Sequence, residues 1–332
     1  TKIRVYPELK SPIQWGFFLF RLPSSKNKEE GFFMSWRIVY ISEAEEMKLY
    51  LDNLKVIKKE QEILIPLSDI HTIIVDNNRT VVTGQLMNKL TEYHILLIFC
   101  DQNHHPNVFS LGLYSHYRVY GVLHKQINWS DEVKGNMWRR IVQIKIRNQA
   151  SLLEYLEKDP NVVNRLRTLA NQVEFDDYTN REGHAAKLYF NELFGPSFQR
   201  TRGSVDPYNA ALNYGYIVLR ACVARTIVAY GLHPAFGIGH RNQFNAFNLV
   251  DDCMEIFRPV IDFWVAVTID DDDYLTLEAK QLLIRRLSAK ILIDGQRQTV
   301  LNAIDIFVQS FIKAMNENND KLLVYPENGV AV

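Results

Sequence analysis

Acidic residues and a histidine with the chemistry of metal ligands are concentrated in one stretch of the chain. GLHPAFGIGHRNQFNAFNLVDDCMEIFRP, residues 231–259, places His240 directly after a glycine-rich turn, and Asp251, Asp252 and Glu255 follow it. On a helix, Asp252 and Glu255 would share one face, with about 5 to 6 Å between their Cβ atoms. Asp251 would point about 100° away from Asp252 and need not share the site. Carboxylate oxygens with an imidazole nitrogen suit Mn²⁺ or Mg²⁺ better than structural zinc, which favours thiolates and imidazoles.

A further candidate ligand, Glu182, lies in DDYTNREGHAAKLYFNELFG, residues 176–195. Thr179 or Asn180 is predicted to cap a helix whose first turn contains Glu182. Gly183 follows immediately, although glycine inside a helix costs about 1 kcal/mol relative to alanine. Its presence indicates that another group approaches this turn closely.

Each candidate also has a purely structural explanation. The positive end of a helix dipole favours an acidic residue in the first turn, which by itself accounts for Glu182. A single histidine such as His240 is more often a surface or hydrogen-bonded residue. Arg258 follows Glu255 by three residues and could form an ordinary helix ion pair with it. The combination favours a divalent-metal site, because two acids beside an apolar helix face are costly unless they are solvated, paired or metal-bound.

Composition restricts the class of protein. The chain has 332 residues, 47% of them hydrophobic and 12% aromatic, which allows two domains with sizeable cores and excludes a disordered protein. Its 38 basic and 38 acidic residues argue against a wholly basic nucleic-acid coat, but allow a basic face. Cys100, Cys222 and Cys253 form no CxxC motif, which suits a reducing cytoplasm. No run approaches the roughly 18 apolar residues of a membrane helix, so no membrane association is expected.

Two hydrophobic patterns divide the chain. Residues 34–120 contain short runs rich in Val, Ile, Leu and Tyr, such as RIVYIS, and are predicted to form a β-rich domain. Residues 121–318 repeat apolar positions at intervals of three and four, which predicts helices. Residues 319–332 are predicted to be a weakly ordered tail. The expected fold class is therefore α+β, with a small N-terminal β-rich domain followed by a larger all-α catalytic domain.

Residues 1–33 are predicted to be translated upstream sequence or an added extension. Met34 precedes the first strand-like run, and the apolar piece at residues 15–20 is followed by Arg21 without an A-x-A cleavage pattern, which disfavours a signal peptide. Residues 28–31 could be encoded by purine-rich codons resembling a bacterial ribosome-binding site. The intact mass of the product from the native locus tests this prediction, which a product beginning at Thr1 or a preceding Met would contradict.

Four motifs occur in a fixed order: REGHAAKLYF (181–190), DPYNAALNYGYIVL (206–219), GLHPAFGIGH (231–240) and NLVDDCMEIFRPVID (248–262). Together they resemble the CRISPR-associated integrase family called protein one of the adaptation machinery, over about residues 34–318. The resemblance implies that Glu182, His240 and Glu255 are catalytic and hold Mn²⁺ or Mg²⁺, with Asp252 in a supporting role. Glutamate at position 255, where many relatives carry aspartate, resembles the type II-A branch, and Cys253 stands where leucine is usual.

The resemblance implies a metal-dependent DNA integrase of CRISPR spacer acquisition. A 3′-hydroxyl of a captured protospacer fragment would attack a phosphodiester at the CRISPR leader-repeat, while a metal ion offsets the charge developing at phosphorus. Two alternatives are a metal-dependent endonuclease that hydrolyses DNA with water as the nucleophile, and a non-catalytic DNA-binding scaffold whose carboxylates brace helices. Candidates for phosphate contact, each of which alone would be ordinary solvated surface, are Arg181, Lys187, Arg200, Arg202 and Arg241.

The resemblance also implies partners. The family forms a homodimer through its β-rich domains, and two dimers are bridged by a dimer of CRISPR-associated protein two. In type II-A systems the effector nuclease and a ring-forming accessory protein join acquisition. All of these partners are expected in the cytoplasm.

Overall fold

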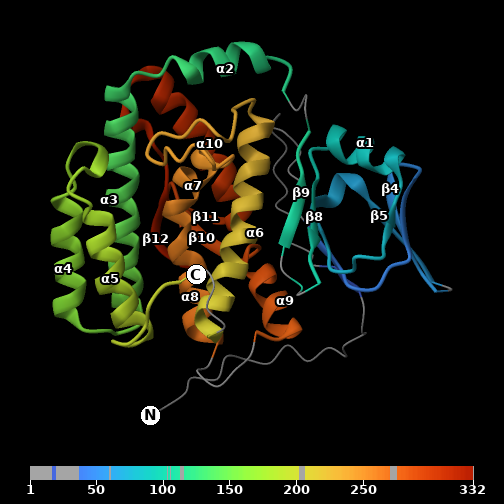
Figure 1. Ribbon diagram of the computed structural model, residues 1–332, viewed down its shortest axis with the longest axis horizontal. Coiled ribbons are helices and arrows are strands. Elements are labelled where there is room, and N and C mark those ends of the chain that lie inside the picture. Colours follow the sequence, from blue (N-terminus) through green and yellow to red (C-terminus); the bar gives the residue numbers. More distant parts are fainter. Residues whose placement is uncertain are drawn as a thin grey trace.

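Two β-sheets lie beside a helical bundle in the computed structural model of the chain (Figure 1). The structure describes residues 17–19, 37–59, 61–102, 104, 106–112, 116–201, 206–269 and 275–331. Within these ranges the strand-rich region comes first and a mostly helical region follows, which confirms the predicted α+β class. Apart from Phe17–Leu19, residues 1–33 lie outside the described residues.

The N-terminal region contains a five-stranded sheet of order β1-β2-β6-β8-β9 and a four-stranded sheet of order β5-β4-β3-β7. In the larger sheet the central strands β2, β6 and β8 are parallel, and the edge strands β1 and β9 are antiparallel to their neighbours. The elements are β1 (Phe17–Leu19), β2 (Arg37–Ile41), β3 (Glu46–Tyr50), β4 (Asn53–Lys58), β5 (Gln61–Pro66), the short 3₁₀ helix η1 (Leu67–Asp69), β6 (Ile70–Val75), β7 (Val81–Val82), α1 (Gly84–Glu92), β8 (Leu96–Cys100) and β9 (Pro106–Ser110).

The central strands of the larger sheet are buried on both faces. Ile38 and Tyr40 of β2 belong to the core shared with the helices, whereas Val39 and Ile41 belong to a second core with the smaller sheet and α1. Successive side chains of a strand point to opposite faces, so a single strand contributes to both cores. A continuous apolar run such as RIVYI is typical of a parallel strand covered on both sides.

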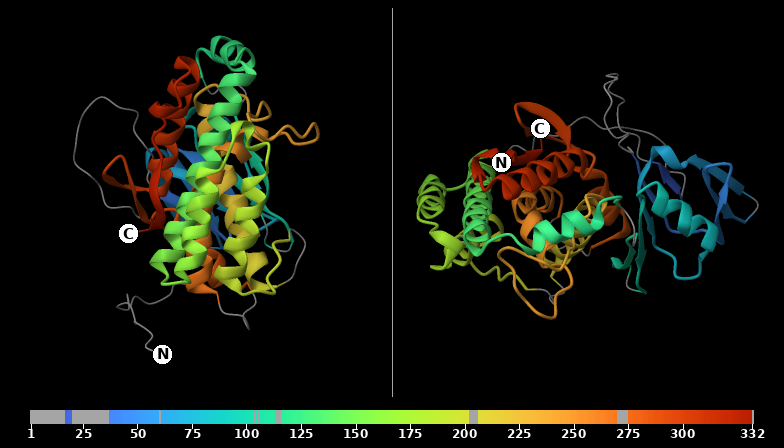
Figure 2. Two further views of the ribbon diagram at one scale, coloured as in Figure 1. Left: turned by 90° about the vertical axis from the view of Figure 1, so that its left-hand side faces the viewer. Right: turned by 90° about the horizontal axis from the view of Figure 1, so that it is seen from above.

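The helical region is arranged around α6, which contacts β8 and β9 of the larger sheet and packs against α7, α8, α9 and α10 (Figure 1, Figure 2). Its helices are α2 (Val119–Ile127), α3 (Asp131–Tyr155), α4 (Pro160–Asn171), η2 (Phe175–Asp177), α5 (Arg181–Phe194), α6 (Pro207–Ala229), α7 (Asn248–Met254), η3 (Glu255–Phe257), α8 (Arg258–Thr268), α9 (Leu277–Arg286), α10 (Val300–Glu317) and η4 (Asp320–Leu322). None of the helices in the described ranges is long and apolar enough to cross a membrane.

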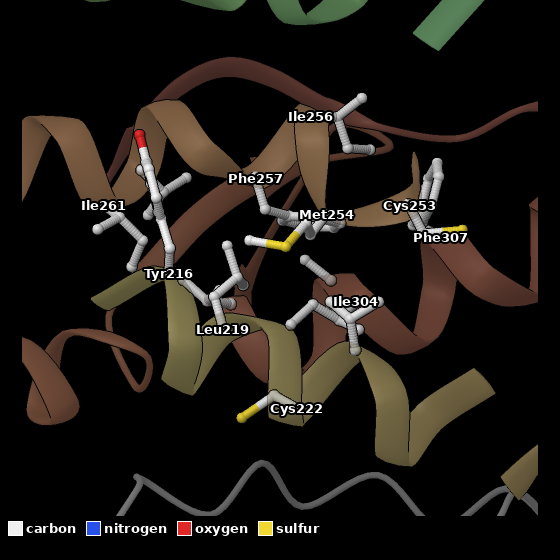
Figure 3. Packing of buried hydrophobic residues seen from close by; sticks show 14 of the residues in the cluster. Tyr216, Leu219, Cys222, Cys253, Met254, Ile256, Phe257, Ile261, Ile304 and Phe307 are labelled. Carbon is white, nitrogen blue, oxygen red and sulfur yellow. The ribbon is translucent and has the colours of Figure 1, made fainter. Parts of the chain in front are cut away.

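The core of this region forms where α6 meets α7, η3 and α10. Tyr216 and Leu219 of α6 pack against Met254 and Phe257, and Phe307 of α10 closes the cluster (Figure 3). The rings of Phe257 and Phe307 meet edge to face with centroids 5.7 Å apart, a favoured aromatic geometry. Most of α6 is apolar and buried, with polar residues such as Asn213 and Arg220 at half-buried positions, and the segment that follows Glu255 packs against it.

The structure contradicts the sequence prediction at residues 290–299. The apolar spacing predicts continuous helix there, but the chain forms a hairpin of β10 (Lys290–Ile293) and β11 (Gln296–Thr299). Asp294 and Gly295 in the turn have positive φ angles of 51° and 66°. A two-residue Asp-Gly loop between apolar runs is a strong hairpin signal, because its backbone twist matches that of paired strands. The local turn chemistry therefore decides the structure here.

A third strand, β12 (Pro326–Ala331), pairs with β10 on the side opposite β11. The sequence PENGVA contains residues that are depleted in strands, so the sequence pattern alone did not predict this element. Asn148 of α3 donates hydrogen bonds to the carbonyl oxygens of Pro326 (3.2 Å) and Ile256 (3.4 Å). One buried amide therefore connects α3, β12 and η3.

Gly215 allows α6 to lie close to α8, because a Cβ atom at this position would be 2.6 Å from Cγ2 of Ile261. We expect Gly215→Ala to lower the free energy of unfolding by about 1–3 kcal/mol through overpacking. The matched control is Gly121→Ala in α2, where no atom lies within 4 Å of the new Cβ; it should gain up to about 1 kcal/mol from helix propensity. Urea unfolding measures both changes, and equal stabilities of the two variants would contradict the close packing.

Candidate functional site

Glu182 is positioned by a polar cap at the N-terminus of α5. Asn180 has a left-handed backbone, with φ of 51°, and its side chain accepts a hydrogen bond from the Gly183 amide at 3.1 Å. Asp177 accepts hydrogen bonds from the amides of Arg181 (2.8 Å) and Glu182 (3.0 Å). The first amides of α5 are thus satisfied by Asp177 and Asn180, and the Glu182 carboxylate is available for another partner.

That partner is Lys145 of α3, which is buried between two carboxylates. Its Nζ atom lies 2.5 Å from Oε1 of Glu182 and 2.5 Å from Oε2 of Glu255. Arg258 approaches the other oxygen of Glu255 at 3.0 Å. The Glu255 side chain is only 2% exposed and that of Glu182 is 24% exposed. Two acids from different elements are therefore held together by one ammonium group.

Opposite charges control the ionisation of this cluster. Burial favours the neutral form of Lys145, but the nearby carboxylates of Glu182 and Glu255 outweigh it and raise the pKa of the lysine. Burial would likewise favour protonated Glu255, yet the charges of Arg258 and Lys145 hold its pKa below the ordinary value. Lys145, Glu255 and Arg258 are therefore held in their charged forms, so that the carboxylates face two cationic side chains.

His240 is held by the buried carboxylate of Asp252. One oxygen of Asp252 accepts hydrogen bonds from the backbone amide and Nδ1 of His240, both at 2.8 Å. The other accepts from the amides of Ile238 (2.6 Å) and Gly239 (3.2 Å). The hydrogen bond to Asp252 raises the pKa of His240, although burial opposes it. With Nδ1 directed at Asp252, Nε2 is the ring nitrogen left for another ligand.

The glycines before His240 make room for this arrangement. A Cβ atom on Gly237 would lie 2.4 Å from the carbonyl oxygen of His240 and 2.8 Å from Oδ2 of Asp252. On Gly239 it would lie 2.2 Å from the ring of Trp138, which also packs edge-on against the imidazole with centroids 5.4 Å apart. The glycine-rich turn predicted from the sequence thus packs closely against the Asp252 carboxylate and the Trp138 ring.

The structure brings the predicted ligands into one region, but their side chains are not arranged to coordinate a metal ion as they stand. Glu182 and Glu255 meet through Lys145, and both carboxylates contribute to the raised pKa of His240. Within the described ranges, no three His, Cys, Asp or Glu side chains are grouped so that they could hold an ion as they stand. Asp251 points elsewhere, as predicted, and pairs with Arg220 at 2.7 Å. Arg258 does pair with Glu255, so the ion pair that offered a structural explanation is also present.

The candidates for phosphate contact differ in their surroundings. Lys187 is exposed on α5, whereas Arg181 is half-buried beside Glu182. Arg241 is exposed and joins the His240 loop to the turn before α5 through Asp176, at 3.1 Å. Arg200 is half-buried and bonds to Asn209 (2.9 Å) and Asn213 (2.7 Å), so it connects the α5–α6 loop to α6. Arg202 lies outside the described residues.

Sequence reasoning overlooked Lys145 and Asp177. Lys145 follows Trp138 by two helical turns and stands between Ile144 and Ile146 on a helix whose neighbouring face is buried. A lysine within a buried helix face is a signal for a paired acid, because charged residues are rarely buried without a partner. Asp177 gave a weaker signal, since an acid shortly before a helix is common at caps.

Comparison with known proteins identifies a common family. The family model described as CRISPR associated protein Cas1 matches residues 39–305. A CRISPR-associated endonuclease Cas1 from Neisseria meningitidis serogroup C (strain 8013) is 39% identical over 297 residues, which are 89% of this chain and 97% of the relative. Another, from Francisella tularensis subsp. novicida (strain U112), is 24% identical and spans 72% of this chain and 81% of the relative. These names give no system type, so type II-A stays a prediction.

Solved structures share the fold. A CAS1 protein from Thermotoga maritima superimposes with a TM-score of 0.68 at 18% identity, covering 84% of this chain and 96% of its own. A casposase bound to integration product gives 0.69 at 18% identity, with 86% and 92% covered. A chain of a Cas6-RT-Cas1–Cas2 complex gives 0.68 at 19% identity, covering 86% of this chain but 35% of its own.

The hydrogen bond between Asp252 and His240 leads to a prediction for pH dependence. Because Asp252 is the main cause of the raised pKa of His240, we expect Asp252→Asn to lower that pKa. In the wild type, the protonated pair stabilises the fold fully below the ordinary histidine pKa, and this contribution is lost as the pH rises through the raised value. NMR titration of the His240 ring measures the shift.

The matched control is Asp251→Asn, which changes the same charge at the neighbouring residue but removes the pairing with Arg220. It should leave the His240 pKa near the wild-type value. An unchanged pKa in Asp252→Asn, with the fold intact, would show that the hydrogen bond does not control the titration.

Proposed function

The chain belongs to the Cas1 family of CRISPR-associated proteins, and from this premise we propose that it is a metal-dependent DNA integrase of spacer acquisition. The observation that carries the proposal is that Glu182 and Glu255 meet at one buried cation, with His240 near enough for both carboxylates to help raise its pKa. These residues come from α5, η3 and the loop before α7, so that the fold as a whole assembles the site. The proposed substrates are a protospacer fragment and the CRISPR leader-repeat.

The donor set fits Mn²⁺ or Mg²⁺. Oε2 of Glu255 is buried and faces the Lys145 ammonium at 2.5 Å. That ammonium shows that a cation is accepted between Glu182 and Glu255, and Nε2 of His240 offers a nitrogen ligand. Oxygen donors with one imidazole suit these ions. Glu182, His240 and Glu255 would hold the ion, which would offset the charge developing at phosphorus and favour ionisation of the attacking hydroxyl.

The joining step exchanges one phosphate ester for another. The 3′-oxygen of the fragment forms a bond to phosphorus while the bond from phosphorus to the 3′-oxygen of the target strand breaks. The attacking hydroxyl releases a proton and the leaving oxygen takes one up, so the step needs no external energy source. Asp252 acts through His240, because its hydrogen bond fixes the orientation of the imidazole that would hold the ion.

Two other activities would use the same residues differently. With water in place of the 3′-hydroxyl, the site would hydrolyse DNA, as the name endonuclease of the relatives implies. As a scaffold, the chain would bind DNA without chemistry, and the carboxylates would serve only as ion-pair partners of Lys145 and Arg258. The casposase of similar fold was solved bound to an integration product, which favours joining.

The proposed partners are a second copy of this chain and CRISPR-associated protein two. Two solved structures of similar fold are Cas6-RT-Cas1–Cas2 complexes, in which a Cas1 and a Cas2 assemble together. We extend this assembly to the present chain, with the β-rich region as the proposed dimer surface. A type II effector nuclease and an accessory ring protein would join only if the chain belongs to the type II-A branch.

A strand-joining assay tests the proposed function. Glu182→Gln removes one proposed ligand with little change in size, and we expect it to lower the joining rate by more than about 100-fold. Asp252→Asn, which acts through His240, should lower it by roughly 10- to 100-fold. The assay combines a leader-repeat plasmid with a short duplex carrying free 3′-hydroxyls, in Mn²⁺, Mg²⁺ or EDTA, with and without protein two.

Folding and DNA binding serve as controls for these variants. Glu182 is partly exposed, so Glu182→Gln should keep the thermal unfolding temperature close to that of the wild type and retain most DNA affinity. Metal-dependent cleavage without joined product would favour the endonuclease. DNA binding with no chemistry in any condition would favour the scaffold, and full joining by Glu182→Gln would contradict the role of Glu182 as a metal ligand.

A further inference from the structure

Lys145 occupies the position at which the proposed metal ligands meet. Its ammonium is 2.5 Å from an oxygen of Glu182 and 2.5 Å from an oxygen of Glu255, closer than Arg258 comes to Glu255. The lysine side chain is 8% exposed, so water does little to screen these charges. A divalent ion held by both carboxylates would have to take the place of this ammonium, because two cations cannot share one position.

We propose that Lys145 is an internal cation that holds the metal site together in the absence of metal and turns to a DNA phosphate when a divalent ion displaces it. This inference rests on the proposed function and deepens it. The four-carbon stem of lysine is flexible and its ammonium is a compact point charge, so the group can move without a change in the backbone. Phosphate oxygens beside the metal are the acceptors that the joining reaction would supply.

The charge balance of the site supports this role. Without metal, the two glutamates are neutralised by Lys145 and Arg258, and the pairing satisfies buried charges that would otherwise be costly. A divalent ion adds two positive charges to a balanced cluster. Displacement of the ammonium toward the negative phosphate restores the balance, so metal and DNA should bind cooperatively through Lys145.

Both acids keep some compensation when this lysine is removed. Arg258 already pairs with Glu255, and Glu182 is partly exposed to water, so neither acid would be left isolated without Lys145. An apolar side chain of similar length would fill the space that the lysine occupies, although removing one partner of a buried ion pair costs stability. Because Arg258 still compensates Glu255, we expect Lys145→Met to fold with reduced stability, which allows the role in metal binding to be measured.

The first measurement is the Mn²⁺ affinity without DNA, from the electron paramagnetic resonance signal of free Mn²⁺. We expect Lys145→Met to bind Mn²⁺ at least about 10-fold more tightly than the wild type, since removing a neighbouring like charge favours the incoming cation. Lys145→Arg keeps the charge and should keep the weaker affinity. Equal or weaker Mn²⁺ binding by folded Lys145→Met would overturn the role as a competing cation.

The matched control is Lys313→Met, which removes the same charge from an exposed position on α10. It should leave the Mn²⁺ affinity at the wild-type value, so that a general effect of net charge is separated from the local one. If a thermal unfolding experiment shows that Lys145→Met is not folded, Lys145→Gln takes its place, because it removes the charge while keeping a polar end. The same increase in Mn²⁺ affinity is expected for it.

The second measurement tests the movement to phosphate. Fluorescence anisotropy gives the affinity for a short DNA duplex that ends in 2′,3′-dideoxynucleotides, with and without Mn²⁺. By linkage, the factor by which Mn²⁺ changes the DNA affinity equals the factor by which DNA changes the Mn²⁺ affinity. The ion adds the same two charges to both proteins, so a difference in coupling reports on Lys145 itself. We expect the enhancement by Mn²⁺ to be at least about 5-fold larger in the wild type than in Lys145→Met. Equal enhancement would overturn the movement.

The outcomes separate this inference from the proposed function. If the wild type joins DNA with Mn²⁺ but Lys145→Met has the wild-type Mn²⁺ affinity and coupling, the inference fails and the proposed function stands. If the wild type neither binds Mn²⁺ nor joins DNA with protein two present, the proposed function fails and the inference fails with it.

Discussion

The ion pairs of Lys145 with Glu182 and Glu255 are the interaction on which the arrangement of the site depends. They join α3 to the start of α5 and to η3, which are far apart along the chain. Burying charges costs several kcal/mol per ion unless partners compensate them, so Lys145 and Arg258 are what allow the chain to keep Glu255 inside a helical core beside the partly exposed Glu182. The same helix carries Trp138 against the imidazole of His240, and so contacts every part of the site.

A single carboxylate has a comparable role in the loop before α7. The two oxygens of Asp252 accept three backbone amides and the imidazole Nδ1, so that the path of the chain from Ile238 to His240 is fixed by one buried side chain. The glycines follow from this, because the backbone must approach Asp252 and Trp138 too closely for a Cβ atom. The glycine-rich turn and Asp252 therefore form one structural unit, although they are separated in the sequence.

The sequence predicted local features of the site, such as helix caps, but not the ion pairs between residues far apart in the chain. The cap at Asn180, Glu182 in the first turn and the separate direction of Asp251 follow from helix geometry, which acts over a few residues. The position of Lys145 between two acids could not be predicted without the fold. Helical periodicity shows which face of a helix is buried, but not which residues of other elements lie against it. The hairpin at residues 290–299 was missed for a different reason, since its Asp-Gly signal is local but lies within an apolar run that resembles a helix.

The charge balance also bears on how the fold and the proposed metal chemistry are related. Where a metal supplies the only charges that hold its ligands together, as in small zinc domains, removing it unfolds the protein. Here two cationic side chains neutralise Glu182 and Glu255, and Asp252 orders His240 through hydrogen bonds, so each proposed ligand has a protein partner. On this proposal folding would not depend on the ion, and the site would bind and release it without losing its shape. The cost would be a competitor at the centre of the site, which would make metal affinity lower than the ligands alone would give.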